Sequence, residues 1–158
     1  MAITAGRDYV CSSEIRTVLP GAGPSRACVV VTRRALYLIP HVSISGGGVT
    51  ITRTTVTIGG MPPAQWLANL LAEPNMTDEA LDQALAAQCA TISGAVAKPL
   101  DSFKRIKIRD GFFGRSVRMS QRAEGLWGNP LKENFAWRLT KQELSACSAF
   151  FASDSRLV

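Results

Sequence analysis

The 158-residue sequence contains a single histidine, His41. Any catalytic system that pairs serine or cysteine with histidine must use this residue, and no spacing in the chain selects an acid to orient it. The four cysteines, Cys11, Cys28, Cys89 and Cys147, stand far apart and never form the Cys-x-x-Cys pair that is typical of zinc sites. We therefore expect no enzyme activity, no metal and no cofactor, and we expect the thiols to be free and mostly buried.

Long apolar runs are missing as well. No stretch of about 18 apolar residues occurs, so the sequence predicts no transmembrane helix. Residues 1–8 lack a basic segment followed by an apolar one, which argues against a secretory signal and favours a cytoplasmic protein. Neither a Walker A nor a dinucleotide-binding glycine pattern is present, and we interpret the glycines at 46–48 as the tip of a hairpin.

Composition favours a folded protein, with 46% hydrophobic and 19% charged residues. The length suits one domain spanning residues 1–158. The net charge of +6 is concentrated in one segment, because residues 98–122 hold eight basic and two acidic residues and the remainder of the chain is neutral in sum. Such a local positive field attracts phosphates, anionic lipids or acidic proteins.

Hydrophobic periodicity and turn signals predict an α+β fold. Strands are expected at 9–19, 27–32, 35–39, 103–109, 112–120 and 135–139. A hairpin is expected from strands at 42–45 and 49–52. Helices are expected at 66–71, 77–93 and 141–151, the last opened by the capping box Thr140-Lys-Gln-Glu143.

The clearest local signal is Asp110-Gly111 between two strand-like runs, which predicts a two-residue turn with Arg109 opposite Phe112. Alternation then separates the side chains into two faces. One is a core face with Ile106, Ile108, Phe113, Val117 and Met119, into which Lys104 and Arg115 intrude. The other is a basic face with Phe103, Arg105, Lys107, Arg109, Phe112 and Arg118.

This predicted basic face is the candidate site, and the favoured function is non-enzymatic recognition of a protein partner or an anionic membrane surface. Its cations would make charge-assisted contacts, and Arg115 could join them by reaching round the sheet edge. Alternatively, the basic face is an ordinary solvated surface without a specific partner. A small inhibitor or immunity-type protein is one alternative, and a binder of single-stranded nucleic acid, with rings stacking bases, is another.

Two segments and the C-terminal end resemble bacterial pleckstrin-homology-like domains, the relatives of PH and GRAM domains. The segments are Ala27-Cys-Val-Val-Val-Thr-Arg-Arg-Ala-Leu-Tyr-Leu-Ile-Pro40 and Pro99-Leu-Asp-Ser-Phe-Lys-Arg-Ile-Lys-Ile-Arg-Asp-Gly-Phe-Phe-Gly-Arg115. The resemblance implies an antiparallel barrel or sandwich capped by a C-terminal helix. Residues 41–97 would be an insertion holding a hairpin and two helices. Residues 20–26 lack the basic pattern by which PH domains bind phosphoinositides, so the resemblance does not imply lipid binding at that loop.

Overall fold

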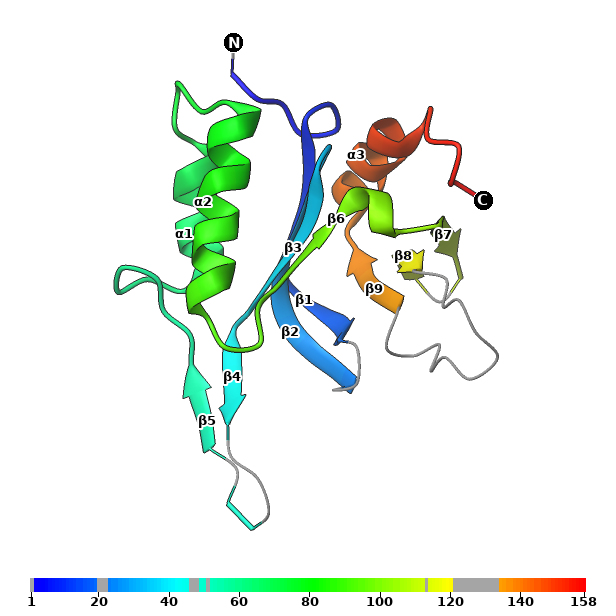
Figure 1. The fold of residues 1–158 in the computed structure, drawn as a ribbon. Coiled ribbons are helices and arrows are strands. Elements are labelled where there is room, and N and C mark those ends of the chain that lie inside the picture. The colour runs from blue at the N-terminus through cyan, green and yellow to red at the C-terminus, as the bar shows by residue number, and fades with distance from the viewer. Residues whose placement is uncertain (1, 20–22, 46–48, 51, 113, 121–133) are drawn as a thin grey trace.

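The computed structural model describes residues 2–19, 23–45, 49–50, 52–112, 114–120 and 134–158. Along the chain, its elements are β1 (Tyr9–Leu19), β2 (Gly23–Thr32), β3 (Ala35–Pro40), β4 (Val42–Ser45), β5 (Thr52–Thr55), α1 (Pro63–Leu71), α2 (Asp78–Thr91), β6 (Val96–Pro99), the 3-10 turn η1 (Leu100–Ser102), β7 (Arg105–Gly111), β8 (Gly114–Ser120), β9 (Asn134–Leu139) and α3 (Lys141–Phe151). Seven antiparallel strands form one sheet in the order β6-β3-β2-β1-β9-β8-β7, and β4 pairs with β5 in a separate ribbon (Figure 1).

Helix starts follow the sequence signals. The Thr77 hydroxyl accepts a hydrogen bond from the Ala80 N–H at 3.1 Å and caps α2. At α3, the Thr140 hydroxyl accepts from the Glu143 N–H, and the Glu143 carboxylate accepts from the Thr140 N–H at 2.9 Å. Each arrangement satisfies backbone donors that have no partner inside the helix. The predicted capping box and the C-terminal helix are both confirmed.

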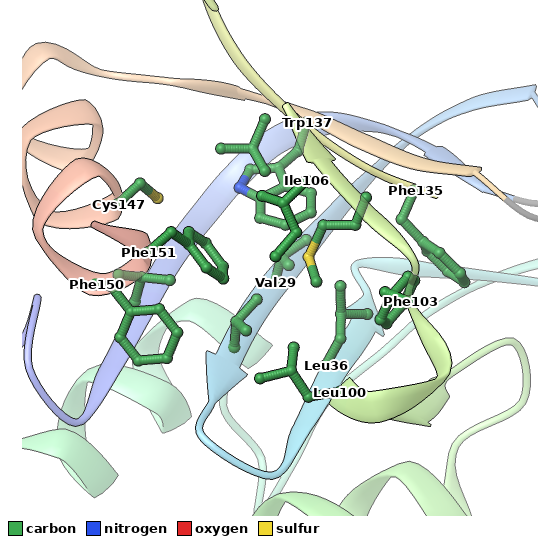
Figure 2. Packing of buried hydrophobic residues seen from close by; sticks show 14 of the residues in the cluster. Val29, Leu36, Leu100, Phe103, Ile106, Phe135, Trp137, Cys147, Phe150 and Phe151 are labelled. Carbon is green, nitrogen blue, oxygen red and sulfur yellow. The ribbon is translucent and has the colours of Figure 1, made fainter. Parts of the chain in front are cut away.

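The main core lies on one face of the large sheet (Figure 2). Its buried residues come from strands at both ends of the sheet and from α3, and they include Leu36, Phe103, Ile106, Phe135 and Phe151. A flat sheet of seven strands would separate its first and last strands by about 29 Å, so one shared cluster requires the sheet to bend strongly around it. The predicted α+β class, with antiparallel strands and a C-terminal helix, is confirmed. β6 and β7 are the edge strands of the sheet and do not pair with each other, so the described strands do not close into a barrel. The outer edge of β7 instead bonds the C-terminal residues: the Ile106 N–H donates to the Arg156 carbonyl at 3.0 Å, and the Val158 N–H donates to the Ile106 carbonyl at 2.9 Å.

A second core lies on the opposite face of the sheet, where α1 and α2 cover β2 and β3 (Figure 1). These helices belong to the predicted insertion 41–97, which also contains β4, β5 and the first two residues of β6. The hairpin strand predicted at 49–52 is instead β5, with Val42 paired to Thr55. The reason is anchoring at the base of the ribbon, because Val56 and Ile58 are buried and the Val56 N–H bonds the His41 carbonyl at 2.9 Å.

One buried acid attaches α2 to the sheet. Asp82 is 8% exposed, and its Oδ1 accepts hydrogen bonds from the Tyr37 hydroxyl and the Thr32 hydroxyl, each at 2.7 Å. The Arg34 guanidinium lies 3.6 Å from the other carboxylate oxygen. Burial, followed by this hydrogen bond, raises the pKa of Tyr37 above its ordinary value. Buried polar groups require such partners, so this contact fixes the position of α2 on β3.

None of the four cysteines forms a disulfide, as expected. Cys28, Cys89 and Cys147 are buried, and Cys11 is half-buried. Burial raises the pKa of Cys147 to about 12 and the pKa values of Cys11 and Cys89 to about 11, so these three thiols are protonated at neutral pH. Within the described ranges, no helix is long and apolar enough to cross a membrane.

Candidate functional site on the outer face of strands β7 to β9

The β7–β8 hairpin differs in register from the sequence expectation. Gly111 pairs with Gly114, so Asp110 and Gly111 are strand residues and the connection begins only after Gly111. In the predicted register, Ile106 would have faced Arg115 across the strands. In the observed register it faces Met119, and Asp110 faces Arg115. Apolar pairs and an opposite-charge pair stabilise a ladder, and this preference overrides the local Asp-Gly turn signal.

The shift moves the partner of each β7 residue by four positions, an even number, so it leaves the sorting of the described side chains between the two faces unchanged. Phe113, predicted on the core face, lies outside the described residues. Ile106, Val117 and Met119 are buried in the main core, as predicted. On the opposite side, the cations of β7, β8 and β9 are all exposed. We call these residues the basic face: Arg105, Lys107, Arg109, Arg118 and Arg138.

Arg138 was missed by the sequence analysis. It lies on β9, where Phe135, Trp137 and Leu139 are buried and Arg138 is exposed between them. The alternation in Phe135-Ala-Trp-Arg-Leu139 carried this signal. What the sequence did not reveal is that β9 pairs with β8, which brings Arg138 beside Ser116.

Four of the five cations lie in two rows across the three strands, and Arg105 lies opposite Ser120 in a third. The first row is Arg109, Ser116 and Arg138, and the second is Lys107, Arg118 and Ala136. Neighbouring strands lie about 4.8 Å apart, so each row holds its polar groups within reach of one ligand. Lys107 stands directly opposite Arg118, and like charges in that position destabilise a sheet.

Among the residues that the structure describes, no acid forms an ion pair with the basic face. Other arginines do have acidic partners. The Arg156 Nη2 lies 2.7 Å from Asp154, and the Arg115 Nε lies 3.4 Å from the Asp110 carboxylate. Arg115 is half-buried on the core side of the hairpin, where the sequence placed it, and it has an acidic partner there.

The two predicted aromatic residues have different positions. Phe103 is fully buried and packs edge-on against Phe135, with ring centroids 5.7 Å apart, so its placement on the basic face is wrong. The turn η1 precedes Phe103 and β7 begins at Arg105, so strand alternation does not extend back to Phe103. Phe112 is 98% exposed and lies at the hairpin tip.

Two hollows adjoin the basic face. A hollow of about 590 Å³ lies at the hairpin tip. From the basic face it is lined by Arg109, Ser116 and Arg138, and its other lining residues are Ile108, Asp110, Gly111, Phe112, Gly114 and Arg115. A hollow of about 50 Å³ lies farther along the same face, between Lys107, Arg109, Arg118 and Ala136. Arg109 and Ser116 line both of them, so the first row of the basic face connects the two hollows.

Two other kinds of site were considered in the described part of the chain, a cysteine–histidine pair and a metal-binding cluster. The Cys28 sulfur lies 3.8 Å from His41 Nε2, but Cys28 is 1% exposed and is inaccessible to a substrate. Within the described ranges, no three His, Cys, Asp or Glu residues gather in a group that could hold a metal ion.

Comparison with known proteins gives no relative: no protein-family model, no curated protein and no solved structure matches the chain.

Proposed function

We propose that this chain is a non-enzymatic binding module that recognises a protein partner or an anionic surface through its basic face. One observation carries the proposal: five exposed cations share one sheet face without a described acidic partner, and Lys107 stands directly opposite Arg118. Such an arrangement costs stability in the free protein. An anionic partner would convert that repulsion into charge-assisted hydrogen bonds.

We also propose that the fold is PH-like. Three features support the proposal. The sheet bends around one core, β9 returns to pair with β1, and α3 packs against that core. Within the predicted insertion 41–97, α1 and α2 cover the outside of β2 and β3, as expected of an insertion in this scaffold.

The burial of Phe103 weighs against a general binder of single-stranded nucleic acid. Such proteins use several aromatic rings as stacking platforms on a basic surface. With Phe103 in the core, Phe112 is the aromatic residue that remains at the predicted site, and it stands at the hairpin tip rather than among the cations. Nucleic acid is therefore the less favoured partner, and the nuclease-treated lysate in the experiment below tests for it.

The test is a capture experiment from native lysate, comparing wild type with Arg105→Glu/Lys107→Glu/Arg109→Glu. A matched variant, Arg26→Glu/Arg53→Glu/Lys141→Glu, reverses the same number of exposed charges outside the basic face. Circular dichroism first establishes that both variants fold. We expect the captured partner to be lost with the first variant and retained with the second. Nuclease-treated and lipid-depleted lysates identify its class, and an unchanged captured set would refute the proposal.

A further inference from the structure

The tip of the β7–β8 hairpin presents an aromatic side chain to solvent. Phe112 is 98% exposed, and it follows Gly111 and precedes residue 113 and Gly114. A Cβ atom built on either glycine would meet nothing within 4 Å, so the backbone of the tip is also open to its surroundings. A fully exposed phenylalanine at a protruding turn adds nothing to the core, and exposed apolar groups next to a polar surface mark interaction sites.

Directly behind the tip lies the first row of the basic face. Arg109 and Arg138 stand on either side of Ser116, and all three residues line the hollow of about 590 Å³ that also borders Phe112. Asp110 lines it too, but its carboxylate is paired with Arg115 at 3.4 Å. Two planar guanidiniums and a hydroxyl donor suit the oxygens of a phosphate group, which accept bidentate hydrogen bonds from arginine. The hollow therefore combines phosphate-binding donors with an apolar side chain at its outer end.

The spacing of these groups matches the cross-section of a lipid bilayer. Phe112 lies three residues beyond Arg109 and directly follows the end of β7, so the two residues are at most about 10 Å apart along the chain. The polar headgroup layer of a bilayer is about 5–8 Å deep on each side. With the arginines at the level of the lipid phosphates, the ring of Phe112 reaches the boundary of the acyl chains.

We infer that the β7–β8 hairpin docks tip-first on a membrane containing anionic phospholipids, with a lipid phosphate between Arg109 and Arg138 and Phe112 inserted below it. The inference rests on the proposed function and names the partner of the same face. A membrane fits better than a protein because protein interfaces bury their aromatic anchors at the centre of a packed patch, whereas Phe112 protrudes at one end. The second row, Lys107 and Arg118, would add attraction to the anionic surface.

The test measures partitioning onto vesicles of phosphatidylcholine with and without phosphatidylglycerol, at 0.15 M salt. We expect binding that requires phosphatidylglycerol. Phe112→Ser should weaken partitioning about tenfold, because burial of part of a phenylalanine ring is worth roughly that factor. Arg138→Gln should weaken it about fivefold, the effect of one cation near an anionic surface. Arg53→Gln, on the distant β5 ribbon, removes the same charge and should change it less than twofold (Figure 1).

Two further arms separate phosphate recognition from simple charge. Vesicles containing cholesteryl hemisuccinate at the same surface charge carry carboxylates and should bind more weakly than those with phosphatidylglycerol. Phe112→Trp should retain binding, and brominated acyl chains should quench the fluorescence of the tryptophan that it introduces. The inference is wrong if wild type ignores phosphatidylglycerol vesicles, if Phe112→Ser binds as wild type does, or if Arg53→Gln is as damaging as Arg138→Gln.

The outcomes also distinguish this inference from the broader proposal. Protein captured by wild type and lost with the charge-reversal variant, without vesicle binding, would leave the basic face as a protein site and refute the lipid partner. Binding of inorganic phosphate measured by calorimetry, again without vesicle binding, would assign the hollow to a free phosphate compound and refute the membrane. If the charge-reversal variant still bound both protein and vesicles as wild type does, the proposed function and this inference would both be refuted.

Discussion

Replacing Asp82 tests whether one buried carboxylate holds α2 on the sheet. Its Oδ1 accepts two hydrogen bonds of 2.7 Å, from the Tyr37 and Thr32 hydroxyls. Asp82→Ala removes the acceptor and leaves both hydroxyls in surroundings where Tyr37 is 5% and Thr32 is 1% exposed. Asp82→Asn is the matched control, since the amide oxygen can still accept from both hydroxyls.

The expected magnitudes follow from these contacts. A hydrogen bond to a charged group contributes about 1.5–3 kcal/mol. Asp82→Ala removes two such bonds, but it also removes the desolvation cost of a buried carboxylate, which offsets part of the loss. We therefore expect Asp82→Ala to lower the free energy of unfolding by about 3 kcal/mol. Asp82→Asn should cost about 1 kcal/mol, because neutral hydrogen bonds are weaker and its NH₂ group would face the Arg34 guanidinium.

The assay is urea unfolding followed by circular dichroism, applied to a double-mutant cycle with Tyr37→Phe. In wild type, Tyr37→Phe should cost about 1.5–3 kcal/mol. In the Asp82→Ala background it should cost almost nothing, because the hydroxyl has already lost its acceptor. Additive costs would refute the hydrogen-bond argument. Equal costs for Asp82→Asn and Asp82→Ala would show that the charge facing Arg34, rather than the shared acceptor, attaches α2.

Two other predictions concern titration and reactivity. Hydrogen bonds from Arg156 hold the pKa of Asp154 below 3.8, so this contact stabilises the fold above about pH 4 and its contribution is lost as the pH falls through the lower, folded-state pKa. Asp154→Asn should cost about 1 kcal/mol at pH 7 and flatten the acid limb of a stability–pH curve; an unchanged acid limb would contradict this. Raised pKa values should make Cys11 and Cys147 alkylate at pH 8 at least about 100-fold more slowly in the native than in the urea-unfolded protein, measured by mass spectrometry; equal rates would contradict their protonation.

The sequence predicted correctly those features that are determined by residues close together along the chain. The capping box at Thr140 lies within a single turn of chain, and it was found where the sequence placed it. The register of the β7–β8 hairpin was missed because two local preferences compete there. An Asp-Gly turn favours one pairing, whereas burial of Ile106 against Met119 favours another, and burial prevails.

The remaining misses depend on contacts between distant parts of the chain. Asp82 occupies the buried side of α2. Its hydrogen-bond donors, Tyr37 and Thr32, lie about 45 and 50 residues away, and no local sequence pattern indicates this pairing. Arg138 joined the basic face only once β9 was placed beside β8. Strand order is set by packing of the whole core, so a residue can be assigned to a face from alternation while its neighbours on that face stay unknown.

The two halves of the sheet differ in what covers their outer face, and this difference supports the proposal of a partner for the basic face. Alternation places Val30 and Tyr37 opposite the main core, and α1 and α2 cover them. The same alternation places Arg118 and Arg138 opposite that core on β8 and β9, where charged groups replace apolar ones. A helix packed over this second half would bury unpaired charges at a cost of several kcal/mol each. Only an anionic partner, which supplies the missing counter-charges, can cover these strands without that cost, and this is why the basic face is the place to test first.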